Sequence, residues 1–124
     1  MKAIHRLSTV LFLAAVLSTF AVAQATPPSA ESVLATAVQT AKAQQKNVLI
    51  HFGASWCSWC KRLDEMLESA EVGKLFHDNY VITHLTIQES EDKLALENPG
   101  AQAMVDAAGG KDSGVPVYIF FDSE

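Results

Sequence analysis

Hydrophobic and polar positions along this chain change period several times, and each change predicts an element. Apolar residues recur every three or four positions over residues 33–41, which predicts an amphipathic helix that is capped by Ser29 or Ser32 and runs to about Gln45. Residues 47–52 are apolar except for His51, as expected for a central strand that is covered on both faces. Residues 53–55 form the turn that follows.

The middle of the chain predicts a strand–helix–strand unit. Helical periodicity returns from Cys57 to Glu68, and Ser69 is placed to cap a short helix that ends at residues 78–79. Residues 80–87 are rich in β-branched side chains and predict a second strand. Two strands joined through helices are expected to pair in parallel.

The last third is more polar. Residues 88–97 read as a surface excursion whose acidic side chains are solvated, and Asn98-Pro99 is a typical start for another helix, which Gly109-Gly110 would end. Residues 117–121 predict the final strand. The pattern as a whole predicts an α/β fold with a mixed sheet flanked by helices.

The N-terminus reads as an export signal. Lys2 and Arg6 precede an apolar stretch over residues 7–22, which small residues follow at an acceptable cleavage position. The stretch is short for a transmembrane anchor. We therefore divide the chain into a signal peptide (1–23), a linker (24–31) and one domain (32–124), located in the periplasm or secreted.

Charge narrows the classes of partner. The chain has 124 residues and a net charge of −5, with no basic patch. These features argue against a nucleic-acid-binding protein and against membrane association beyond the signal peptide.

The candidate chemistry lies in Cys57 and Cys60, the only two cysteines. A strand leads into this pair and a helix leaves it, so the helix N-terminus is expected to stabilise a Cys57 thiolate. Cys60, one turn further along, lies within bonding distance. Cys57 can attack a substrate disulfide and Cys60 can resolve the mixed disulfide.

Three other readings of the pair compete with redox activity. A closed zinc site needs about four ligands, but there is no second cysteine pair, and His77 and His84 have no partner at ligand spacing. Attachment of c-type haem needs histidine where Lys61 stands. An inert bridge would close a very short loop and stabilise little. Redox activity is favoured, with no metal and no cofactor expected.

Trp56-Cys57-Ser58-Trp59-Cys60 and Gly114-Val115-Pro116 before the final strand together resemble the thioredoxin superfamily, in particular its exported bacterial thioredoxin-like proteins. The resemblance covers roughly residues 32–124. It implies that Cys57 is the exposed nucleophile, that Cys60 is the buried resolving thiol, and that Trp56 shields the disulfide and contacts substrate.

The resemblance also implies a cis bond before Pro116, which from the residues alone is equally well a trans strand-starter. The Val115 backbone would then pair with an extended substrate segment. Thioredoxins place a buried acid where this chain has His51. A neutral imidazole there is a candidate proton acceptor for Cys60, and the alternative is a hydrogen-bonded core histidine.

The family fold continues beyond the proline strand with an edge strand and a final helix, so the sequence predicts a thioredoxin-like fold that lacks both and is C-terminally incomplete. The predicted function is thiol–disulfide exchange with protein disulfides or dithiols, in partnership with a redox protein. The direction (reductase, oxidase or isomerase) stays open. The alternative is a non-catalytic binding module or a thiol carrier of copper or zinc.

Overall fold

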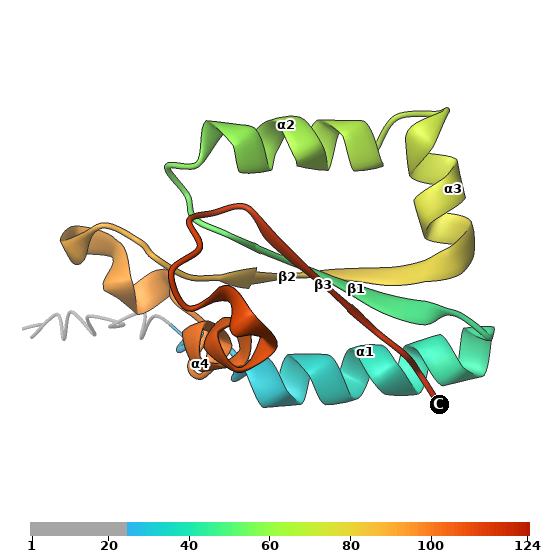
Figure 1. The fold of residues 1–124 in the computed structure, drawn as a ribbon, viewed down its shortest axis with the longest axis horizontal. Coiled ribbons are helices and arrows are strands. Elements are labelled where there is room, and N and C mark those ends of the chain that lie inside the picture. Colours follow the sequence, from blue (N-terminus) through green and yellow to red (C-terminus); the bar gives the residue numbers. More distant parts are fainter. Residues whose placement is uncertain (1–24) are drawn as a thin grey trace, which may run out of the picture.

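The structure, a computed structural model, describes residues 25–124 (Figure 1). The predicted signal peptide therefore lies outside the described residues. The elements are α1 (Ala30–Gln44), β1 (Asn47–Gly53), α2 (Ser58–Leu67), α3 (Val72–Asn79), β2 (Tyr80–Thr86), the 3₁₀ helix η1 (Glu91–Leu96), α4 (Ala101–Val105), the π-helical turn η2 (Asp106–Gly110) and β3 (Val117–Phe121).

Within residues 25–124 the sheet has three strands in the order β2-β1-β3. β1 is central, parallel to β2 and antiparallel to β3, which confirms the prediction from its apolar run and the parallel strand–helix–strand unit. In this register His51 lies opposite His84 on β2 and opposite Tyr118 on β3. Residues far apart in sequence thus meet at the middle of the sheet.

Helices lie on both sides of the sheet, with α2 on one side and α1 and α4 on the other (Figure 1). Successive side chains of a strand point to opposite faces, and β1 shows this alternation. Val48, Ile50 and Phe52 are buried in the main core, which also contains α1 and α4 residues. His51 points the other way, toward α2, where its ring contacts Asp64.

The first helix is built as its sequence predicts. Ser29 is the N-cap, and its Oγ accepts a hydrogen bond from the backbone N–H of Ser32 at 3.2 Å. Ala37 and Ala41 are buried against the sheet. Small side chains at these positions let α1 approach β1 closely.

The helix predicted after Asn98-Pro99 is shorter than expected. α4 begins only after Gly100 (φ 82°), and a π-helical turn replaces its second half. The Asn98 side chain accepts a hydrogen bond from the Thr86 N–H at 2.7 Å and donates one to the Pro28 carbonyl at 2.9 Å. Asn98 therefore ties the end of β2 to the start of α1, and Gly100 occupies the N-cap position.

An aromatic side chain is exposed near the end of β3, beside a cavity. Phe121 packs against the main core, whereas the neighbouring Phe120 is exposed and contacts Tyr80 edge-on. Phe120 and Tyr80 border a cavity of about 1130 Å³. Among the described residues, no helix has the length and apolar character needed to cross a membrane.

Candidate active site

The two cysteines form a disulfide at the start of α2, with an S–S distance of 2.17 Å. Cys57 is the N-cap residue of this helix, and its Sγ accepts a hydrogen bond from the Cys60 N–H at 3.1 Å. Helix N-termini present unpaired N–H groups and a partial positive charge, both of which stabilise a thiolate. The sulfur of Cys57 is therefore placed where a thiolate is favoured.

The predicted contrast between an exposed Cys57 and a buried Cys60 is wrong for this oxidised state. Both residues are nearly inaccessible, at 3% and 4% of their surface. Together with Ala54 they form a small apolar cluster, and Val115 packs against it. This packing leaves Cys57 as inaccessible as Cys60.

Two exposed tryptophans flank the disulfide. Trp56 and Trp59 expose 56% and 67% of their surface. The indole N–H of Trp56 donates to the Gln88 carbonyl at 2.8 Å, while the Arg62 guanidinium lies 4.9 Å from the centre of the Trp59 ring. Large aromatic surfaces held in place beside a reactive group are well suited to contact another protein.

The segment that precedes β3 contacts the cysteines. The Val115–Pro116 peptide bond is cis, as the resemblance implied. Val115 is the partly buried residue that contacts the cysteine cluster. The sequence therefore brings two distant motifs, residues 56–60 and 114–116, to one site.

A buried carboxylate supports the turn before Cys57. Both oxygens of Glu89 accept hydrogen bonds from Ser55, one from its backbone N–H at 2.6 Å and one from its hydroxyl at 2.8 Å. Glu89 exposes only 8% of its surface. The prediction that this acid is solvated is therefore wrong, because the turn at Ser55 offers two donors and packs over the carboxylate.

Gly53 separates Cys60 from His51. A Cβ atom added at Gly53 would lie 3.1 Å from the Cys60 Sγ and 3.3 Å from the His51 Nε2. These two atoms thus border the same small space, which only glycine leaves free. The Nε2 atom is buried and has no hydrogen-bond partner among the described residues.

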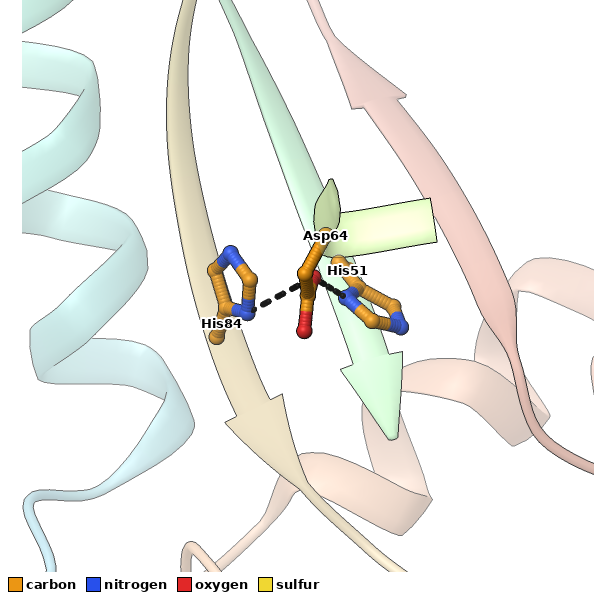
Figure 2. Close-up of side chains that lie close together, drawn as sticks. All are labelled: His51, Asp64 and His84. Carbon is orange, nitrogen blue, oxygen red and sulfur yellow. Dashed lines mark hydrogen bonds and ion pairs between the residues drawn. The ribbon is translucent and has the colours of Figure 1, made fainter. Parts of the chain in front are cut away.

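The other ring nitrogen of His51 belongs to a cluster (Figure 2). His51 Nδ1 lies 3.0 Å from Asp64 Oδ1, and His84 Nδ1 lies 3.6 Å from the same oxygen. A carboxylate accepts but does not donate, so the Nδ1 of His51 carries the proton in this contact. The unpartnered Nε2 is then a free lone pair beside Cys60.

Sequence reasoning missed two members of this cluster. Helical periodicity places Asp64 on the solvent face of the helix from Cys57 to Glu68, and the sequence offers His84 no partner at ligand spacing. The parallel register of β1 and β2 carried the signal for His84, because it places this residue directly opposite His51. Asp64 follows from the tertiary packing of α2 over the strands, which periodicity does not give.

Burial shifts the acid–base behaviour of this region. Removal from solvent lowers the pKa of His51, whereas the Asp64 carboxylate opposes this shift, and the neighbouring His84 adds a smaller lowering. Tyr118 stacks on His51 at 5.1 Å, and burial raises the pKa of Tyr118 to about 12. His51 is therefore held neutral and Tyr118 protonated near pH 7.

A cavity of about 380 Å³ opens beside the disulfide. Its lining includes Cys60, Gly53 and the three residues of the histidine–aspartate cluster. Cys60 and the cluster therefore share one recess on the α2 side of the sheet.

Known proteins agree with this architecture. A structure of a disulphide isomerase from Xylella fastidiosa Temecula1 matches with a TM-score of 0.60 and 21% sequence identity, over 76% of this chain and 66% of that one. This chain therefore spans just under two thirds of that protein. No curated protein shows significant sequence similarity to the present chain. The sequence profile described as Thioredoxin-like matches residues 29–123. With that match over most of its length, the chain belongs to the thioredoxin-like family.

Proposed function

We propose that this protein is a thiol–disulfide oxidoreductase that acts on protein disulfides or dithiols through Cys57 and Cys60. The observation that carries the proposal is the disulfide at the N-terminus of α2, with the Cys57 sulfur in the N-cap position. A structural staple between residues three apart would add little stability, since it closes a very short loop.

In the reducing direction, the Cys57 thiolate attacks one sulfur of a substrate disulfide. A Cys57–substrate disulfide forms, and the other substrate sulfur leaves as a thiolate. The Cys60 thiolate then attacks the Cys57 sulfur, which forms the intramolecular disulfide and releases the second substrate thiolate. Two electrons pass from the protein to the substrate, and a redox partner protein restores the dithiol. The reverse sequence oxidises a substrate dithiol.

The substrate surface is proposed to consist of Trp56, Trp59 and the segment at Val115-Pro116. The two indoles are exposed beside the disulfide, and Val115 contacts the cysteines directly. An extended substrate segment can add to the Val115 backbone as a further strand, which supplies affinity without requiring one sequence.

His51 is proposed to accept the proton of Cys60 through Nε2. This nitrogen borders the space next to the Cys60 sulfur and has no other partner in the described part of the chain. Asp64 orients the ring by binding the opposite nitrogen. The arrangement follows the general logic of a thiol, a base and a group that orients the base.

Export to the periplasm or the cell exterior is also part of the proposal, and it rests on the charged and apolar pattern of residues 1–23. Disulfide chemistry is sustained in such compartments. The proposed domain starts at about residue 32.

The test is the redox equilibrium of the Cys57–Cys60 pair in graded glutathione buffers, read by alkylation and mass. A potential near −270 mV would indicate a reductase, and one near −120 mV an oxidant. The protein should also exchange with a model protein disulfide, and Cys57→Ser should abolish this activity. Absence of exchange by the wild type, or exchange that survives in Cys57→Ser, would overturn the proposal. A function that tolerates loss of both cysteines would indicate the binding-module alternative. Metal bound to the reduced thiols, together with slow exchange, would instead indicate the thiol carrier.

A further inference from the structure

We propose that His51, Asp64 and His84 form a binding site for a divalent transition-metal ion, with Zn²⁺ as the fitting ion. The site lies on the α2 side of the sheet, beside the cavity next to the disulfide. It uses none of the atoms that exchange disulfides.

The ligand atoms have the spacing that such an ion needs. The two histidine Nδ1 atoms lie 3.0 and 3.6 Å from Asp64 Oδ1, and the three ligand atoms all lie within 4.8 Å of one another. Zn–N and Zn–O bonds of about 2.0–2.2 Å in a tetrahedron place ligand atoms about 3.3 Å apart. The two imidazoles and the carboxylate therefore need only small shifts to enclose an ion. Figure 2 shows the carboxylate between the two rings.

The backbone fixes two of the three ligands before any ion arrives. His51 and His84 are paired residues of the parallel strands β1 and β2, so both rings stand on one face of a hydrogen-bonded sheet. α2 passes over this face and supplies Asp64. Metal sites built on strands and helices hold their ligands more precisely than sites built on loops.

The site has a rigid inner side and an open outer side. His51 is buried, whereas the side chains of His84 and Asp64 are about half exposed and line the cavity. An ion can therefore enter from solvent, and a water molecule can occupy a fourth position. This combination of three protein ligands and one open position is typical of accessible zinc sites.

The donor set selects the kind of metal. Two imidazole nitrogens and one carboxylate suit Zn²⁺ and its transition-metal neighbours, whereas Mg²⁺ and Ca²⁺ prefer oxygen ligands throughout. Coordination at Nδ1 of the neutral ring moves the single ring proton of His51 to Nε2, so Nδ1 is free to bind the ion.

This site differs from a carrier that binds metal through its thiols. In the oxidised protein both sulfurs are held in the disulfide and cannot coordinate an ion. Zinc bound by the oxidised form must therefore use other ligands, so the experiment is independent of whether the protein exchanges disulfides.

The test is a calorimetric titration of Zn²⁺ into the oxidised full chain, which is prepared without a histidine tag and freed of metal by chelation. We expect one ion per chain. His84→Ala and Asp64→Asn should each weaken binding by about tenfold or more, since each removes one ligand. Replacement of Zn²⁺ by Co²⁺ should give the intense visible absorption of a four-coordinate ion in the wild type, and this band should be lost in His84→Ala.

The chain has four histidines, and the two outside the cluster provide matched controls. His77→Ala changes an exposed histidine elsewhere on the described surface, and His5→Ala changes one in the predicted signal peptide. Both should bind Zn²⁺ like the wild type. His84 is half exposed, so its removal leaves the core intact and its variant can be compared by circular dichroism. The proposal is overturned if the oxidised wild type shows no saturable binding, or if His84→Ala binds as tightly as the wild type.

Discussion

The Sγ atom of Cys57 lies 3.1 Å from the backbone nitrogen of Cys60 and takes the place of a capping oxygen at the start of α2. A helix cap is a position at which an acceptor is favoured, and a negatively charged acceptor most of all. The same contact that begins the helix thus stabilises the thiolate form of one cysteine rather than of both. This asymmetry supports the proposed attacking role of Cys57 and the proposed resolving role of Cys60.

Substitution of each cysteine should separate the two roles. Cys57→Ser should abolish exchange with a model protein disulfide, because the attacking sulfur is absent. Cys60→Ser should still attack but should accumulate the mixed disulfide, since no second thiol releases it. The adduct can be counted by mass spectrometry under non-reducing conditions. If Cys57→Ser forms the adduct and Cys60→Ser does not, the assignment of roles is reversed.

Gly53→Ala should destabilise the protein by about 1–3 kcal/mol, as expected for overpacking of a filled site. The new methyl group would press on the Cys60 sulfur at 3.1 Å and on the His51 Nε2 at 3.3 Å. Urea unfolding monitored by fluorescence would measure the change in the free energy of unfolding. Gly114→Ala is the matched control, because a Cβ there meets no atom within 4 Å. Equal effects of the two substitutions would show that the space beside Gly53 is not tightly filled.

Glu89→Gln should lower the free energy of unfolding by about 1–2 kcal/mol, because two hydrogen bonds to a charged acceptor become weaker neutral ones. Both carboxylate oxygens accept from Ser55, and a neutral glutamine amide removes the negative charge that strengthens both bonds, although the Ser55 hydroxyl can turn to accept from the amide. Thermal or urea unfolding would measure this loss. Glu91→Gln, at an exposed position in η1, should change the free energy by no more than about 0.5 kcal/mol. A Glu89→Gln protein as stable as Glu91→Gln would contradict a supporting role for the buried carboxylate.

The sequence predicts most of the fold because its elements are locally determined. The apolar run of β1 reflects a strand that is buried on both faces, the serine cap of α1 satisfies unpaired first-turn N–H groups, and the helical period after Cys57 reflects one buried face. The position of the disulfide at a strand–helix junction follows from the same local patterns.

The contacts of the histidine–aspartate cluster and of the buried Glu89 join residues that lie far apart in the sequence. His84 meets His51 through strand register, and Asp64 meets both through the packing of α2. Glu89 is buried by a turn that lies 34 residues earlier in the chain. Polar residues that gain partners through tertiary contacts have the same sequence signature as solvated ones, so charge and periodicity alone misassign them.

Acidification should lower the free energy of unfolding of the metal-free protein because His51 is protonated more readily in the unfolded chain. Burial lowers the pKa of this histidine below its ordinary value of 6.5, so the unfolded chain binds a proton at a pH where the folded protein does not. The contribution of His51 to the free energy of unfolding is then at its full value above about pH 6.5. It falls as the pH drops from there toward the lowered pKa of the folded state. Urea titrations between about pH 5 and 8 in a chelator would show this slope. His51→Gln should flatten it and His77→Ala should not; a slope unchanged in His51→Gln would assign it to other groups.

Zinc should inhibit disulfide exchange, provided that both the metal site and the proposed role of His51 hold. An ion on Nδ1 forces the remaining ring proton onto Nε2, the atom that borders the Cys60 sulfur, so this nitrogen can no longer accept a proton from the thiol. Resolution of the mixed disulfide should then slow, while its formation by Cys57 continues. Single-turnover kinetics with a model protein disulfide, with and without Zn²⁺, would separate the two steps. In His84→Ala the same inhibition should require a zinc concentration at least about tenfold higher. His77→Ala should respond like the wild type. Equal inhibition of the first step, or inhibition that persists in His84→Ala, would show that zinc acts on the thiols themselves rather than through the cluster.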